Sequence, residues 1–111
     1  MENINSISFG TNWNSKLNCS AFSSIRLRND KKFILGHEYQ VILKDQPIFV
    51  CRLVAISHFM LDGMSDAMSF IDTGYNKKET IAMIEKMYKN KDIDVHSVTW
   101  SHLVFYHDTK L

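Results

Sequence analysis

The sequence predicts one α+β domain, in which several strands are followed by a pair of helices and a final strand. Its 111 residues, 45% hydrophobic and 23% charged, suit a single globular core. Apolar and polar residues alternate with a period of two in much of the first sixty residues, whereas helical spacing prevails in residues 65–88. A strand-like run then closes the chain. Since one strand cannot bury its apolar face alone, we expect this run to pair back into the earlier sheet.

The first sixty residues contain four expected strands separated by turn-forming residues. Residues 1–20 are rich in Asn and Ser, which bond to their own backbone, so we expect a short strand there and then an irregular loop to about Ala21. We expect a turn at 29–30 and a hairpin loop at 44–47. The last run is longer than a typical strand, so we expect it to bend. The expected strands are 4–9, 22–28, 39–43 and 48–59.

The second half of the chain is expected to hold two helices and the final strand. The first helix covers residues 65–71. Asn76 precedes the second helix as an N-cap, and Glu79 stands at the capping-box position three residues on. The final strand is expected at 95–106. The expected buried face of the second helix consists of Thr80, Ile81, Ile84, Met87 and Tyr88.

Several classes of protein are disfavoured by the composition. No apolar run approaches the roughly 20 residues that span a bilayer, and the first residues lack the regions of a signal peptide. We therefore expect a cytoplasmic protein with no membrane contact. Cys19 and Cys51 lack metal-site spacing and are too few for a disulfide framework, and the five histidines show no ligand spacing. We expect Cys51 in the core, no metal and no cofactor.

Positive charge is concentrated in the first half of the chain, although the formal net charge is only +1. Residues 1–60 hold seven Lys and Arg against four Asp and Glu, whereas residues 61–111 hold six against eight. This excess is densest at Arg26, Arg28, Lys31 and Lys32. Together with Ser23 and Ser24, the two arginines place two hydroxyls and two guanidiniums on one strand, and such groups can bind phosphates or base edges. The alternative is a polar strand face that meets only water.

A second candidate for nucleic-acid contact is the loop at residues 12–16. Trp13 stands there between amide side chains, so it can stack on a base while Asn12 or Asn14 reads the base edge and Lys16 adds a charge. The alternative for Trp13 is a lid folded back on a small core, because large aromatic side chains usually bury their area.

Three segments carry a resemblance to a known family. Ser24-Ile25-Arg26 lies on a strand, residues 36–41 make a turn before the next strand, and residues 72–79 lead through Gly74 into a helix. In this order, and with the strands between them, they resemble ASCH domains of the PUA-like superfamily over residues 15–107. The resemblance implies a small PUA-like β-barrel with two flanking helices, a cleft beside the Ser24 strand, and an association with RNA.

Some small stand-alone members of that family act as amidohydrolases on acylated cytidine nucleosides. They use a Thr nucleophile on this strand, a Lys three residues before it, and a Glu before the helix. In this chain the three positions hold Ser24, Ala21 and Thr73, with Asp72 one residue from the last. Catalysis by Ser24 would therefore need Lys16, five residues before Ala21, as the activating base and Asp72 to assist.

Three functions follow from these observations. The first is a small RNA-binding module with a site formed by Asn12–Lys16 and Ser23–Arg28. The second is a hydrolase, either an amidohydrolase acting on a modified nucleoside or a ribonuclease. The third is a protein-interaction module of the phage or mobile-element type, whose surface would be the last strand or the helical face expected from Met60, Met64 and Met68.

Overall fold

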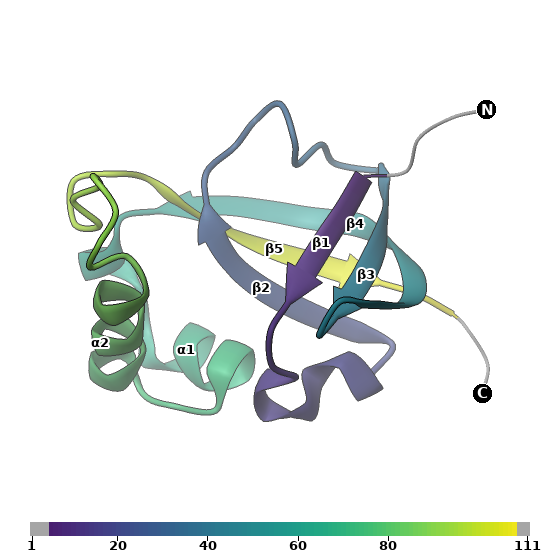
Figure 1. Cartoon of the computed structure of the whole chain (residues 1–111), viewed down its shortest axis with the longest axis horizontal. Coiled ribbons are helices and arrows are strands. Elements are labelled where there is room, and N and C mark those ends of the chain that lie inside the picture. Colours follow the sequence, from purple (N-terminus) through teal and green to yellow (C-terminus); the bar gives the residue numbers. More distant parts are fainter. Residues whose placement is uncertain (1–4, 109–111) are drawn as a thin grey trace.

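The computed structural model describes residues 5–108 and forms a curled sheet with helices packed at one end (Figure 1). The strands are β1 (Asn5–Phe9), β2 (Ala21–Leu27), β3 (Glu38–Leu43), β4 (Gln46–Phe59) and β5 (Trp100–Tyr106). The helical elements are the 3₁₀ segments η1 (Trp13–Asn18) and η2 (Leu61–Gly63) and the α-helices α1 (Asp66–Thr73) and α2 (Lys77–Met87). Residue 4 of the first expected strand lies outside the described residues.

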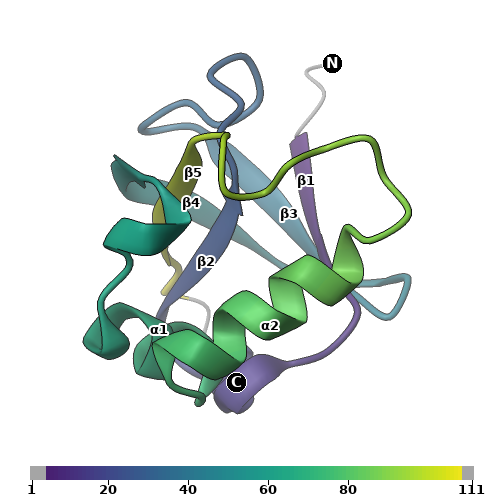
Figure 2. The same ribbon diagram turned by 90° about the vertical axis from the view of Figure 1, so that its left-hand side faces the viewer.

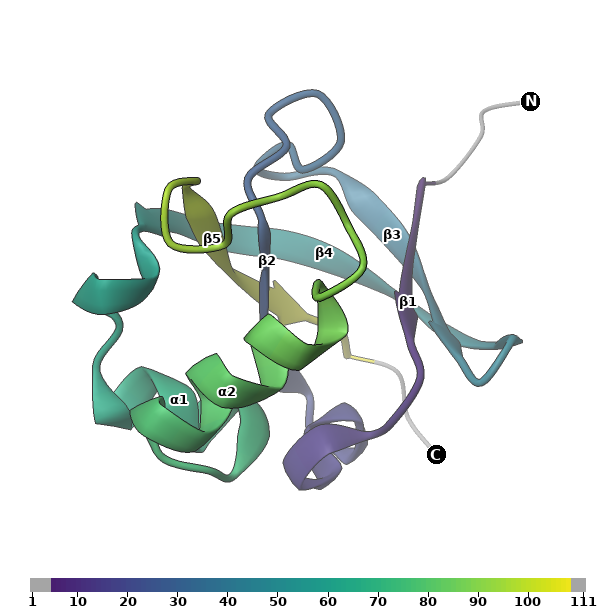
Figure 3. The same cartoon turned by 60° about the vertical axis from the view of Figure 1, so that its left-hand side comes forward.

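The strands follow the order β1-β3-β4-β5-β2 in the sheet, so the prediction that the last strand returns to the sheet is confirmed. β1 runs parallel to β3, and all other neighbours are antiparallel. β1 and β2 are therefore the two edge strands. The curl brings them near each other on the side where the helices lie (Figures 2 and 3). None of the helices in the described part of the chain is long and apolar enough to cross a membrane.

The hairpin between β3 and β4 is tighter than the expected loop at 44–47. Lys44 and Asp45 alone form the turn, with φ of 51° and 67°, which is the left-handed backbone of a two-residue hairpin turn. β4 then pairs from Gln46 onward and contains a register shift between Leu53 and Ala55. A bulge at this point bends the strand, as its length predicted.

Two hydrophobic clusters hold the fold together. The first fills the inside of the curled sheet and includes Phe22, Tyr39, Leu103 and Phe105. Cys51 belongs to it with 2% of its surface exposed, which confirms the prediction for that residue. The second cluster lies between the helices and the sheet and is centred on Leu61, Met64, Ile84, Val95 and Trp100.

The second helix begins as the sequence predicted. The Asn76 side chain accepts the backbone N–H of Glu79 at 2.8 Å, and the Glu79 carboxylate accepts the N–H of Asn76 at 3.2 Å, which completes the capping box. Thr80 and Ile84 are buried as expected. The prediction for Met87 is wrong: this residue is the last of α2 and is 63% exposed.

Two further expectations require correction. The final strand starts at Trp100 rather than 95, because Asp94 closes a turn by accepting the N–H of His96 and the hydroxyl of Ser97. The three methionines do not share a helix face, because they belong to separate segments. Met60 precedes η2, Met64 is buried after it, and Met68 lies in α1.

Candidate functional site

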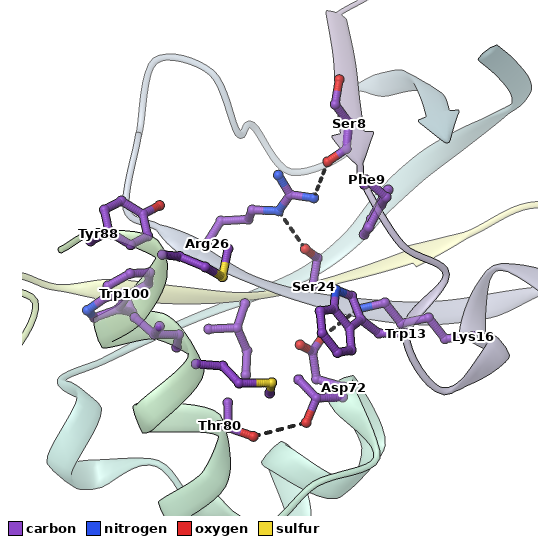
Figure 4. Close-up of a pocket in the computed structure, with 16 residues that line it drawn as sticks. Ser8, Phe9, Trp13, Lys16, Ser24, Arg26, Asp72, Thr80, Tyr88 and Trp100 are labelled. Atoms are coloured by element: carbon purple, nitrogen blue, oxygen red, sulfur yellow. Dashed lines mark hydrogen bonds and ion pairs between the residues drawn. The ribbon is translucent and has the colours of Figure 1, made fainter. Parts of the chain in front are cut away.

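A pocket of about 180 Å³ lies where β1, η1 and β2 meet α1 and α2 (Figure 4). β2 is an edge strand, so side chains from both of its faces reach the pocket. Apolar and aromatic side chains make up most of the wall. Its charged members are Lys16, Arg26 and Asp72, and the Ser24 hydroxyl lies among them.

Lys16 reaches the pocket because the segment expected to be an irregular loop folds into η1. Asn14 and Ser15 adopt φ of 56° and 53°, and the Asn12 side-chain oxygen accepts the N–H of Leu17 at 2.9 Å. Leu17 anchors the turn in the first cluster. The adjacent Lys16 is thereby drawn inward and retains only 6% exposure.

Asn14 joins η1 to the end of α1. Its side-chain amide donates to the carbonyl oxygen of Phe70 at 3.2 Å, and the same oxygen accepts the N–H of the C-cap residue Gly74 at 2.9 Å. Gly74 ends α1 beside this contact, and its φ of 84° is a left-handed conformation that favours glycine, whereas a Cβ there would meet the Asn14 side chain at an ordinary contact distance of 3.4 Å. In this structure Asn12 and Asn14, expected to read base edges, therefore brace the loop that delivers Lys16.

Lys16 and Asp72 form a buried ion pair. Lys16 Nζ donates to Asp72 Oδ1 at 2.9 Å, and the Ser23 hydroxyl donates to the same oxygen at 3.1 Å. Burial lowers the pKa of Lys16, Asp72 opposes that change, and the positive charge of Arg26 adds to it. Ser23 is thus a support for Asp72 on the helix-facing side of β2 rather than a residue of the pocket wall.

Arg26 spans the gap between the two edge strands. Its Nη2 donates to the carbonyl oxygen of Ser8 at 2.6 Å, and its Nε donates to the Ser24 hydroxyl at 2.7 Å. The guanidinium carbon lies 4.7 Å from the centre of the Phe9 ring, within the range of a cation–π contact. Burial lowers the pKa of Arg26.

Trp13 was expected either to stack on a base or to fold back as a lid on the core, and the structure shows features of both. It is half-buried, lines the pocket and packs edge-to-face on Tyr75, with ring centroids 6.3 Å apart and planes at 76°. The ring therefore covers α1 and η1 and also forms a wall of the pocket, where a planar ligand can meet it.

Arg28 is separated from the pocket. It lies just beyond β2, is exposed, and holds Asp30 through two hydrogen bonds of 2.9 and 3.0 Å. Exposed Lys31 and Lys32 follow it. The basic strand thus splits into Arg26 inside the pocket and a small exposed basic group at the far end of β2.

Several pocket residues were not predictable from the sequence. Phe9 ends an edge strand, and Met83 and Tyr88 lie on or just beyond α2, so only the curl of the sheet and the docking of α2 bring them together. Helical spacing did mark Tyr88 as inward-facing, but it did not indicate a pocket. Within residues 5–108, no group of three His, Cys, Asp or Glu side chains is placed to hold a metal ion.

This arrangement suits the binding of a small planar ligand. Phe9, Trp13 and Trp100 offer aromatic surface, while Lys16, Arg26 and Ser24 offer hydrogen-bond donors. Asp72 adds an acceptor beside them. A few convergent polar groups in an otherwise apolar hollow are typical of sites that fix the orientation of a small molecule.

The sequence matches no protein-family model and no curated protein. Among solved structures, the ASCH domain from Lactobacillus crispatus JV V101 superposes with a TM-score of 0.60 and 15% identity, covering 85% of this chain and 70% of that one. Protein EF3133 from Enterococcus faecalis V583, described with the family model DUF984, superposes with a TM-score of 0.67 and 7% sequence identity. The match covers 100% of this chain and 88% of that one. These likenesses establish the fold, and the α+β PUA-like barrel expected from the resemblance to ASCH domains is confirmed.

Proposed function

Because the chain has the fold of an ASCH domain, we propose that it is an RNA-binding module that takes one unstacked nucleobase into the pocket beside Ser24. The observation that carries this proposal is the size and lining of the pocket, about 180 Å³ with aromatic walls and cationic donors. A cavity of roughly 150 Å³ accommodates one benzene ring. One heterocyclic base therefore fits, whereas a stack of bases does not.

Single-stranded RNA supplies such bases, since its unstacked bases can be turned outward and packed on aromatic side chains. Trp13 and Phe9 would contact the faces of the base. Lys16 and the Ser24 hydroxyl would meet its polar edge, where carbonyl oxygens and ring nitrogens accept hydrogen bonds. The exposed group of Arg28, Lys31 and Lys32 would attract the backbone phosphates.

Fluorescence anisotropy with labelled single-stranded RNA octamers of each base tests this proposal. We expect the association constant K to fall between 50 and 200 mM salt. A plot of log K against log salt concentration should have a slope of about −0.7 for each phosphate contacted. Trp13→Ala removes one stacking surface and should weaken binding roughly 5- to 150-fold, since stacking on an aromatic side chain contributes about 1–3 kcal/mol per base. Tyr106→Ala is the control, because Tyr106 is exposed on β5 outside the pocket.

The proposal fails if no RNA binds at 50 mM salt. It also fails if Trp13→Ala and Tyr106→Ala bind RNA equally well, because the contact would then lie elsewhere on the surface.

A second candidate function is hydrolysis of a modified nucleoside. One observation favours it: Lys16 and Ser24 line the same pocket as the distant Asp72, and burial lowers the pKa of Lys16, which is the direction that an amine base requires. In the present arrangement Lys16 Nζ donates to Asp72, and the Ser24 oxygen accepts from Arg26. Catalysis by Ser24 would therefore require Lys16 to turn from Asp72 toward Ser24 when substrate enters.

Incubation with acylated cytidine, followed by chromatography of the released cytidine, tests this function. Turnover lost in Ser24→Ala and kept in Ser57→Ala, an exposed serine of β4, would support it. Equal turnover in the two variants, or none in the wild-type protein, would exclude Ser24 as the nucleophile.

A further inference from the structure

The charges that line the pocket do not cancel. Lys16 and Arg26 are cationic, and Asp72 is the single carboxylate among the lining residues. The ion pair of Lys16 with Asp72 uses that carboxylate, since Lys16 Nζ lies 2.9 Å from it and both side chains are 7% exposed. One positive charge, that of Arg26, is left over in the pocket.

The partners of Arg26 are neutral oxygens. It donates to the Ser8 carbonyl and the Ser24 hydroxyl, and among residues 5–108 no carboxylate lies within 4.0 Å of its nitrogens. A guanidinium carries five N–H donors, and these two contacts use two of them. The remaining donors therefore have no partner among the described residues, and the side chain lines the pocket (Figure 4).

Arg26 is half-buried, and the cost of withdrawing part of its guanidinium from water points in the same direction. Moving a charge out of water is unfavourable by several kcal/mol unless an opposite charge accompanies it. Among residues 5–108, the carboxylate whose charge acts on Arg26 is that of Asp72, and Lys16 already holds that group. An anion in the pocket would remove the imbalance and accept the free N–H groups, with the short, strong hydrogen bonds of a charged pair.

We infer that the ligand of the pocket is an anion: a nucleobase compound that presents a phosphate oxygen to the guanidinium of Arg26. This inference rests on the proposed function, because it specifies the charge of the ligand that the pocket takes. Two sources carry the same chemistry, a free nucleotide and the phosphodiester next to a base in RNA. A neutral nucleoside lacks the group that Arg26 binds.

The first experiment compares ligands by isothermal titration calorimetry on the wild-type protein at 50 mM salt. The probes are the four ribonucleosides, their 3′- and 5′-monophosphates, and dinucleoside monophosphates as diester counterparts. A hydrogen bond to a charged group contributes about 1.5–3 kcal/mol, so we expect a phosphorylated form to bind roughly 10- to 100-fold more tightly than its parent nucleoside. Preference for the diester indicates RNA as the source, and preference for the monoester indicates a free nucleotide.

The second experiment uses substitutions of Arg26 that separate charge from structure. Arg26→Gln and Arg26→Lys both lose the two-pronged contact to Ser8 and Ser24, but only the lysine keeps the charge. We expect the phosphate preference to fall below about threefold in the glutamine variant and to persist at about tenfold in the lysine variant. Arg52→Gln is the matched control: it removes one positive charge from an exposed site on β4 outside the pocket, and the preference should not change.

The outcomes distinguish this inference from the function on which it rests. If nucleosides bind as tightly as their phosphates, the pocket is a nucleobase site but the inference about charge is wrong. If no nucleoside, nucleotide or RNA binds, the proposed function itself fails. If both Arg26 variants fail to fold, the affinity ratio of the wild-type protein alone decides, and a ratio near one overturns the inference.

Discussion

The ion pair between Lys16 and Asp72 allows a quantitative prediction for Lys16→Met. Both side chains are 7% exposed, so the substitution leaves a buried carboxylate without its cation. Removing one partner of a buried pair costs about 3–5 kcal/mol. The Ser23 hydroxyl still donates to Asp72, so we expect the lower end, about 3 kcal/mol. With an unfolding entropy of about 2.1 cal/mol/K per residue over 111 residues, Tm falls by about 13 °C.

A second substitution shows whether the unpaired charge causes this loss. Lys16→Met combined with Asp72→Asn removes both charges, keeps the shape at position 72, and leaves an amide oxygen for the Ser23 hydroxyl. We expect the double variant to be about 2 kcal/mol more stable than Lys16→Met alone, because neutral buried pairs avoid the cost of an isolated charge.

Urea unfolding followed by circular dichroism measures both free energies. Lys86→Met, at an exposed site on α2, is the control and should change stability by less than about 0.5 kcal/mol. The reasoning is refuted if Lys16→Met costs less than about 1 kcal/mol, the range of exposed ion pairs. It is also refuted if the double variant is the less stable of the two.

Three further predictions follow from the structure. At pH 8, one thiol per folded chain should react rapidly with a disulfide reagent, because Cys19 is exposed while burial raises the pKa of Cys51 to about 12; two fast thiols would contradict this. Gly74→Ala should lower the free energy of unfolding by roughly 1–2 kcal/mol, because φ is 84° there, and an unchanged urea midpoint would contradict it. The hydrogen bond to Glu85 raises the pKa of His96, so the contact stabilises the folded state fully below pH 6.5, and this stabilisation is lost as pH rises through the raised pKa. His96→Gln should therefore lower Tm more at pH 6 than at pH 9. Equal losses at the two pH values would argue against the contact.

Local features of the fold were predictable from the sequence. The capping box of Asn76 and Glu79 involves two residues three positions apart, so its signal is complete in the sequence. Alternation of apolar and polar side chains located the strands, since it reflects the pleat of each strand itself. The predictions failed at Met87 and at 95–99, where burial or strand pairing depends on which other elements lie nearby.

Four polar residues of the pocket were candidates in the sequence, but their arrangement and the apolar wall were not predictable. Lys16, Ser24, Arg26 and Asp72 were all candidates, yet the sequence did not indicate that Arg28 would lie outside the pocket. Nor did it show that Asn12 and Asn14 would brace η1, because their partners depend on how that turn folds against α1.

The sequence by itself determined the class of fold and singled out the polar side chains Lys16, Ser24, Arg26 and Asp72, which line the pocket. Tertiary structure decided how those side chains pair. Lys16 and Asp72 are 56 residues apart, and Arg26 reaches Ser8 across 18 residues. These pairings exist because the sheet curls until its two edge strands approach each other, and because η1 turns Lys16 inward. Such contacts depend on the packing of the whole chain, which no short pattern of residues encodes.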